Sequence, residues 1–385
     1  MEIYLDNAAT TRCYPEAAAL MTRILCEDYG NAASLHKKGV EAEGHIRRAR
    51  ESIATGLKVD EKELIFTSGG TEADNLALIG AATAHARRGR HLITTAIEHP
   101  AVTETLQYLT GEGFSVTYLP VDTHGVIDLD ELAGVIRADT ILISIMHVNN
   151  EVGSVQPLAE AGALIDRMNP QTLFHVDAVQ GMGKLPLYPK RMGIDLMSVS
   201  GHKLHGPKGI GFLYADGRVK INPLCHGGGH QRGLRPGTEN VPVIAAVARA
   251  FEMTLADMET DAAYMHGLRS HFVAGLRQIP DAVINGPDGA DAAPHIISAA
   301  FPPVRGEVLV HALAERAIFA STGSACATTK KERPSPTLRA IGLSSEMIAS
   351  TLRFSLSRFT TKEEIDYTLG VLYDIIPMLR KYVRH

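Results

Sequence analysis

The most constraining feature of this sequence is a series of short apolar segments that alternate with longer helical patterns from about residue 60 to residue 215. Most of the apolar segments are rich in Val, Ile, Leu and Phe without polar alternation, which is typical of strands buried on both faces. Repeated strand–helix–strand order predicts a wound α/β domain with a mostly parallel sheet and helices on both sides. Strands are predicted at Glu63–Thr67, His91–Ile97, Ser115–Val121, Thr140–Val148, Leu173–Val179, Leu196–Ser200 and Gly209–Tyr214, and helices at Thr71–Arg88, Pro100–Gly111, Leu129–Arg137 and Leu158–Met168.

The pattern changes after Tyr214. A glycine-rich stretch marks an irregular loop region, and a long helical pattern follows from Val243 to Gln278. Near the end of the chain, Thr361 and Glu364 have the spacing of a capping box that opens a final helix. The sequence therefore predicts a second, smaller domain of strands and helices, with a boundary near residue 255.

Composition narrows the class of protein. The chain has 385 residues, 45% of them apolar, and 38 Lys and Arg against 43 Asp and Glu give a formal net charge of −5. This balance predicts a soluble globular protein and disfavours a disordered chain or a polybasic nucleic-acid binder. The longest apolar stretch near the middle, Ile141 to Met146, is too short to span a bilayer. Four cysteines without CxxC spacing do not form a disulfide framework, so reduced thiols in the cytoplasm are expected.

Polar residues end two of the predicted strands that follow one another along the chain. Asp177 and Gln180 lie at the end of one strand, and Ser200, His202 and Lys203 lie at the end of the next. The carboxyl ends of parallel strands form the crevice where α/β proteins bind ligands. A buried Asp there needs a cationic partner, and a lysine of depressed pKa is nucleophilic toward an aldehyde. The alternatives are that Asp177 caps a helix and that Lys203 extends to solvent.

Two further motifs lie at predicted strand ends. Ser68–Glu72 turns a strand into a helix through two glycines, which predicts either a phosphate cradle or an ordinary turn capped by Thr71. His99 follows another strand end, although a single histidine is more often structural than catalytic. The pair His226 and His230 has metal-like spacing, but a triple glycine does not hold a helix, so no metal site is expected.

One of the four cysteines is a candidate nucleophile. Cys326 lies among small polar residues and is followed by Lys330 and Lys331, and cations beside an exposed thiol favour the thiolate. Cys26 belongs to an apolar helical pattern and is expected in the core. The other two cysteines offer no comparable case.

Taken together, these motifs resemble the NifS/IscS-type cysteine desulfurases, which are pyridoxal-phosphate enzymes of the aspartate-aminotransferase fold. The resemblance covers nearly the whole chain, in family order. It is carried by YLDNAATT (4–11), FTSGGTEADNLAL (66–78), EHPAV (98–102), HVNNEVGSVQP (147–157), HVDAVQGMGK (175–184), SGHKLHGPKGIGFLY (200–214), RGLRPGTENV (232–241), STGSAC (321–326) and LRFSLSRFTT (352–361).

The resemblance implies a role for each matching position. Lys203 would carry the cofactor covalently, His99 would act as acid and base, and Cys326 would be the nucleophile that forms a persulfide. Asn150 and Arg353 would bind the substrate carboxylate, for which the planar fork of an arginine is well suited. The residues implied to bind pyridoxal 5'-phosphate are Gly70, Thr71, Asn150, Asp177, Gln180, Ser200, His202, Lys203 and Thr238.

The resemblance also implies an architecture and partners. Residues 14–255 would form a large cofactor-binding domain with a mostly parallel seven-stranded sheet. Residues 1–13 and 256–385 would form a smaller α+β domain that carries the catalytic cysteine loop. Thr238 would reach the cofactor phosphate of the other subunit in a homodimer. The implied substrate is L-cysteine, converted to L-alanine, and the sulfur would pass to an acceptor protein for iron–sulfur cluster, thio-cofactor or tRNA thiolation pathways.

Several alternatives remain open at this stage. A selenocysteine lyase or another fold-type-I pyridoxal-phosphate enzyme would share most of these residues, but such enzymes do not require Cys326. A degenerate homologue that acts only as a scaffold would not need Lys203, Asp177 and His99 together. No resident metal is expected, and a transient role of Cys326 as a ligand of an iron–sulfur cluster is left open. A nicotinamide-dependent dehydrogenase is disfavoured because no GxGxxG motif follows the first strand.

Overall fold

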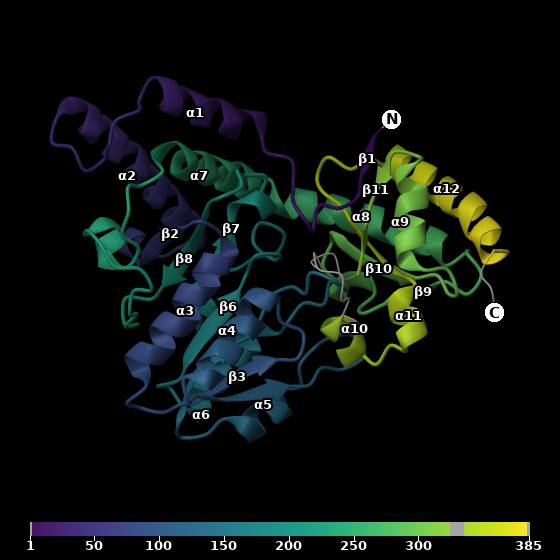
Figure 1. Ribbon diagram of the computed structural model, residues 1–385, viewed down its shortest axis with the longest axis horizontal. Helices are drawn as coiled ribbons and strands as arrows, with labels where there is room; N and C mark the ends of the chain where they lie inside the picture. The colour runs from purple at the N-terminus through teal and green to yellow at the C-terminus, as the bar shows by residue number, and fades with distance from the viewer. Residues whose placement is uncertain (1, 324–334, 383–385) are drawn as a thin grey trace.

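A seven-stranded sheet forms the centre of the computed structural model, which describes residues 2–323 and 335–382 (Figure 1). The strand order is β2-β8-β7-β6-β5-β3-β4. Strand β8 is antiparallel to both of its neighbours, and the other pairs are parallel, so the predicted mostly parallel sheet is confirmed. The strands are β2 Leu64–Thr67, β3 His91–Thr95, β4 Ser115–Leu119, β5 Thr140–Ser144, β6 Leu173–Asp177, β7 Leu196–Ser200 and β8 Gly211–Ala215.

Four of the strands, β3 to β6, end two to four residues earlier than the apolar runs predict. Their apolar runs continue past the last ladder pair into loops at the carboxyl edge of the sheet. Ile97, Met146 and Val148 lie in these loops and are buried without belonging to a strand. An apolar run therefore predicts where the chain is buried, and it overestimates the length of the hydrogen-bonded strand.

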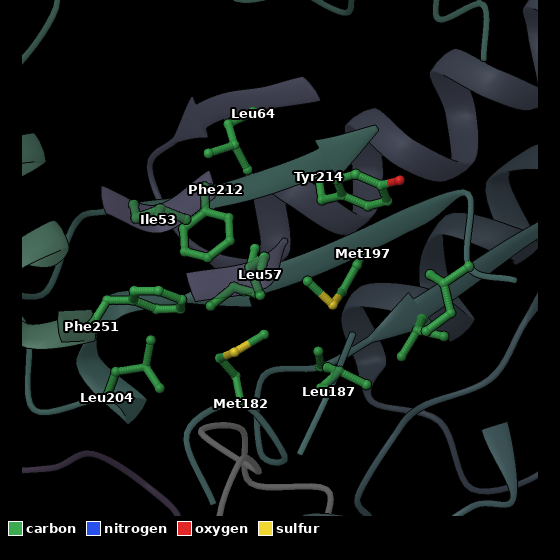
Figure 2. Packing of buried hydrophobic residues seen from close by; sticks show 14 of the residues in the cluster. Ile53, Leu57, Leu64, Met182, Leu187, Met197, Leu204, Phe212, Tyr214 and Phe251 are labelled. Atoms are coloured by element: carbon green, nitrogen blue, oxygen red, sulfur yellow. The ribbon is translucent and has the colours of Figure 1, made fainter. Parts of the chain in front are cut away.

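Successive side chains of the central strands enter different cores. Met197 and Phe212 pack into one cluster, whereas their sequence neighbours Leu196 and Leu213 pack into the cluster on the opposite face. This alternation follows from the two-residue period of a strand, and it explains why the strands are apolar throughout. Figure 2 shows Phe212 and Met197 in the first cluster, together with Phe251 and Leu57 from the covering helices.

Helices cover both faces of the large sheet. Helices α3 and α4 pack on one face, while α2, α5, α6 and α7 contribute to the core of the other face. Helix α1 packs along α7, and the two lie beside α2 in Figure 1. The bounds are α1 Pro15–Cys26, α2 Lys37–Leu57, α3 Gly70–His85, α4 Pro100–Gly111, α5 Leu129–Val135, α6 Leu158–Met168 and α7 Val241–Ala256.

A second, smaller sheet lies beside the first and has the antiparallel order β12-β13-β10-β9. Strands β1 and β11 pair in parallel, which joins the N-terminal segment to this part of the molecule (Figure 1). The elements are β1 Ile3–Tyr4, α8 Met258–Leu276, β9 Val283–Asn285, β10 Ile296–Ala300, α9 Gly306–Ala314, β11 Ile318–Phe319, β12 Ser321–Thr322, α10 Pro336–Ala340, α11 Ser345–Ala349, β13 Thr351–Ser355 and α12 Lys362–Arg380.

The capping box predicted for the last helix is confirmed. The Thr361 side chain accepts from the Glu364 backbone N–H, and the Glu364 carboxylate accepts from the Thr361 N–H. Two of the four orphan donors at the start of α12 are thereby satisfied. The apolar stripe that follows packs into the core of the smaller sheet. Among the described residues, no helix is both long and apolar enough to cross a bilayer.

Two sequence expectations are wrong. The helical pattern from Val243 to Gln278 is two helices, α7 and α8, because Asp257 between them has a non-helical φ of −111° and ψ of 7°. Cys26 is exposed rather than in the core. The buried positions of α1 are Ala17 and Ile24, one heptad apart, and Cys26 lies two residues past Ile24, on the opposite side of the helix.

Candidate active site

A cavity of about 580 Å³ lies at the carboxyl ends of the central strands. Its walls come from the loops that follow β2, β3, β5, β6 and β7, from the N-terminal loop and from β13. The structure brings together ten of the predicted site residues here: Gly70, Thr71, His99, Asn150, Asp177, Gln180, Ser200, His202, Lys203 and Arg353. Thr238 does not line the cavity and is exposed just before α7, and Cys326 lies outside the described residues.

The first turn of α3 forms one wall. The helix begins at Gly70, so Thr71 lies inside it and is not its N-cap. The N-cap is Gly69, which offers no side chain to accept from the first N–H groups of the helix. A Cβ atom at Gly70 would lie 2.8 Å from Cγ2 of Val179, so only glycine allows this close approach to the loop after β6. Open N–H groups at a helix start suit a phosphate.

Asp177 and Lys203 lie at the carboxyl ends of the adjacent strands β6 and β7, with Lys203 in the short helical turn after β7. Asp177 is the last residue of β6, and its buried carboxylate accepts the backbone N–H of Val179 at 2.9 Å. Burial raises the pKa of Asp177, and the nearby His99 and Lys203 oppose that rise. The Lys203 ammonium donates to the carbonyls of Ala8 at 2.5 Å and Ala9 at 2.8 Å. An amine and a buried acid thus face one cavity.

His99 is both a helix cap and a cavity wall. Its Nδ1 accepts the backbone N–H of Ala101 at 3.1 Å at the start of α4. An accepting Nδ1 places the proton of the neutral ring on Nε2. Burial lowers the pKa of His99, which favours this neutral form. The helix cap therefore fixes the tautomer of a histidine that faces the cavity.

Arg353 reaches the cavity from the smaller sheet. This arginine is buried in β13, and its guanidinium donates to the Asn150 carbonyl and to the Asp6 carboxylate, each at 3.0 Å. Its Nε has no hydrogen-bond partner among the described residues. A planar guanidinium that lines the cavity can take a carboxylate ligand.

The anchoring of other cavity residues by the N-terminal loop was not predicted from the sequence. Gln180 donates to the Ala8 carbonyl at 2.9 Å and keeps a second amide hydrogen for another acceptor. His202 contacts Thr10 through Nδ1 at 3.1 Å, and burial, reinforced by Lys203, lowers its pKa to about 4. The motif at residues 4–11 marks this loop in the sequence. Its acceptors for Gln180 and Lys203 are backbone carbonyls, which every residue has, so the sequence could not show these contacts.

Two buried acids beside Asp177 were also not predicted. Asp74 lines the cavity, and its Oδ1 lies 3.6 Å from Nε2 of His175. Glu98 accepts from the Thr95 hydroxyl at 2.7 Å and from the Met146 N–H at 2.9 Å. Burial raises the pKa of Glu98 to about 8 and that of Asp74 well above its ordinary range. The adjacency of Glu98 to His99 was the available signal.

Comparison with known proteins identifies the family of the chain. Residues 3–368 match the family model for aminotransferase class-V. The cysteine desulfurase IscS of Salmonella paratyphi B is 45% identical over 385 residues, which is 99% of this chain and 94% of that relative. The chain belongs to the class V aminotransferase family.

Solved structures of other proteins agree with this assignment to the class V aminotransferases. A NifS-like protein has a TM-score of 0.93 and 41% identity, over 98% of this chain and all of that one. The structure of SspA in complex with cysteine has a TM-score of 0.79 and 33% identity, over 94% and 100% of the two chains. The predicted family and fold are confirmed, and this class V aminotransferase is a pyridoxal-phosphate-dependent cysteine desulfurase.

The cavity of this class V aminotransferase fits its cofactor. The glycine cradle at the start of α3 suits the phosphate, and the buried Asp177 carboxylate suits a protonated pyridine nitrogen. Lys203 supplies an amine at the same cavity. Each of the three groups comes from the end of a different strand, so the fold itself sets their separation.

Proposed function

We propose that this cysteine desulfurase holds pyridoxal phosphate and L-cysteine in the cavity at the strand ends and transfers the substrate sulfur to Cys326. The observation that carries the proposal is the convergence of ten residues from distant segments on one cavity, with Asp177 and Lys203 at the ends of adjacent strands. When bound, the cofactor supplies an aldehyde for the attachment of amines and a ring that accepts electrons.

The chain's own residues would hold that cofactor in a defined orientation. Gly70, Thr71, Ser200 and His202 are assigned to the phosphate, and Lys203 is assigned to the covalent link. Asp177 would keep the ring nitrogen protonated, since a buried carboxylate stabilises a neighbouring cation. Gln180 would donate its remaining amide hydrogen to the ring oxygen.

Arg353 and Asn150 are assigned to the substrate carboxylate. Arg353 is held by Asp6 and by the Asn150 carbonyl, which fixes the plane of its guanidinium. His99, neutral and protonated on Nε2, would donate a proton to the substrate and recover it later. Lys203 would move a proton at Cα of the substrate.

Sulfur transfer would use the thiolate of Cys326, which attacks Sγ of L-cysteine. The new S–S bond forms as the Cβ–Sγ bond breaks, and the bonding electrons stay on Cβ, which takes up a proton. One enzyme thiol and one L-cysteine thus give one L-alanine and one enzyme persulfide. The persulfide would then pass its outer sulfur to an acceptor protein in iron–sulfur cluster, thio-cofactor or tRNA thiolation chemistry.

The proposal includes the arrangement of the chain. Residues 14–255 would act as the cofactor domain, with residues 1–13 and 256–385 as the smaller domain. Two copies would form a homodimer in which Thr238, exposed in the single chain, reaches the cofactor phosphate of the partner. A reducing compartment such as the cytoplasm would keep the Cys326 thiol usable.

Two variants of the holoenzyme test the assignments. Cys326→Ala is expected to bind L-cysteine, seen as a change in cofactor absorbance, while persulfide formation and alanine release are lost. Reduction of the wild-type enzyme with borohydride should fix the cofactor on the peptide that contains Lys203. Desulfuration of L-cysteine by Cys326→Ala at the wild-type rate would contradict the nucleophile assignment. Retained lyase activity on selenocysteine alone would indicate that selenocysteine does not need this thiol.

A further inference from the structure

A second lysine lies buried behind Lys203 and has no part in the proposed chemistry. Lys184 is in the segment between β6 and the short helix η2 Pro189–Met192, and only 7% of it is exposed. Its ammonium donates to the backbone carbonyl of Lys203 at 2.6 Å. Lys184 does not line the cavity, so it supports Lys203 from behind.

The surroundings of Lys184 are basic. Lys203 is the charged neighbour that opposes its protonation, and the pKa values of His202, His205 and His295 are each lowered by burial and by the charge of Lys184. In residues 2–323 and 335–382, no carboxylate lies within ion-pair distance of Lys184. In the part of the chain that the structure describes, the cation is therefore held by a carbonyl dipole without a counter-charge.

An ammonium in this setting is costly to the fold. Burial, followed by the charge of Lys203, lowers the pKa of Lys184 to about 7. A methionine of similar length would fill the same space without burying a charge. A lysine at this position is therefore better explained by what its charge does to its neighbour than by packing.

We propose that Lys184 is a positioning residue for the cofactor lysine: it fixes the Lys203 backbone, and its positive charge disfavours protonation of the Lys203 side-chain nitrogen. The neutral amine is the form that would attack a carbonyl carbon: a C=N bond would replace the C=O bond, and the oxygen would leave as water with the two amine protons. A like charge nearby raises the fraction of that form at a given pH. This inference rests on the proposed assignment of Lys203 as the cofactor lysine.

Three substitutions of Lys184 in the holoenzyme separate charge from hydrogen bonding. Lys184→Gln keeps a donor for the Lys203 carbonyl without the charge, Lys184→Met removes both, and Lys184→Arg keeps a permanent charge. The measurement is the pH midpoint of the visible absorbance of the bound cofactor, which reports the protonation of the Lys203 nitrogen. Lys184→Gln and Lys184→Met should raise the midpoint by roughly one pH unit. Lys184→Arg should leave it unchanged or lower it.

The matched control is Lys190→Gln, because Lys190 is an exposed lysine that pairs with Glu63. Its midpoint should equal that of the wild type. An unchanged midpoint in Lys184→Gln, or a raised one in Lys184→Arg, would overturn the inference. If the two neutral variants fail to retain cofactor, the pH midpoint of Lys184→Arg is the test: an unchanged or lower midpoint supports the inference, and a raised one overturns it.

Borohydride labelling separates this inference from the function on which it rests. If the label is found on Lys203 but the pH midpoint of Lys184→Gln equals that of the wild type, the role of Lys184 is refuted and the cofactor assignment stays intact. A label found on another lysine refutes the cofactor assignment itself.

Discussion

Asp177 is a residue whose charge should matter more than its shape. Asparagine can still accept the backbone N–H of Val179, so Asp177→Asn is expected to fold and to bind the cofactor. The neutral amide of asparagine, however, cannot stabilise a protonated nitrogen in the cofactor ring as a carboxylate would. Turnover of L-cysteine should fall by roughly 10²–10³, as for the loss of one electrostatic stabiliser in an active site. Steady-state alanine release checks the rate, and cofactor absorbance checks occupancy. A rate near that of the wild type would exclude a charged role for Asp177.

Glu98 makes stability depend on pH. Its pKa is about 8 in the folded protein and about 4.5 in the unfolded chain, so the folded state holds a proton that the unfolded chain releases between these values. Stability is therefore lost as pH rises through this window. The glutamine side chain of Glu98→Gln is a neutral amide at every pH in this window, so the variant should not lose stability as the pH rises.

The thermal midpoints of the two proteins check the sign. The midpoint of Glu98→Gln should rise relative to the wild type from pH 5 to pH 8, by about 2–4 °C for each kcal/mol in a domain of this size. The control is Glu43→Gln on the exposed side of α2, which should show no such divergence. A constant difference between wild type and Glu98→Gln across the range would contradict the prediction.

At the scale of an element, the start of α3 is the part most sensitive to one added methyl group. Gly70→Ala would place Cβ 2.8 Å from Val179 and push the helix start from the loop after β6. The displaced helix start should lose one N–H hydrogen bond to the cofactor phosphate. Loss of one hydrogen bond to a charged group costs about 1.5–3 kcal/mol, so cofactor affinity should fall roughly 10–100-fold. Titration of the apoenzyme with pyridoxal phosphate measures the change. Gly111→Ala is the control, since a Cβ there meets nothing within 4 Å and affinity should not change.

The elements themselves could largely be predicted from the sequence. Continuous apolar runs identified the strands, and the strand-end rule located Asp177 and Lys203 at a common edge. The break at Asp257 could not be predicted, because the apolar pattern runs through it and no Pro or Gly marks it. Lys184 was not recognised either, since its partner is a backbone carbonyl.

At the scale of the whole molecule, the proposed exchange of Thr238 between subunits predicts complementation. Lys203→Ala and Thr238→Ala are each expected to impair every site of their own homodimer. A mixed dimer places Lys203 of one subunit and Thr238 of the other in one intact site. After equal mixing and reassociation, activity should approach about one quarter of the wild type, because half of the dimers carry one intact site of two. If activity stays at the mean of the two parents, Thr238 does not act across the interface.

The contact between the N-terminal loop and β13 at the cavity has a consequence for synthesis. Asn7 and Ala8 bond to Ser355, and Asp6 pairs with Arg353, so residues separated by almost the entire chain lie together. The loop that orients Lys203 and Gln180 is synthesised well before its partner strand β13, since Ala8 and Ser355 are 347 positions apart. Until β13 has been made, the N-terminal loop lacks its hydrogen bonds to Ser355. We therefore expect the cavity to be complete for the cofactor only after β13 has been made.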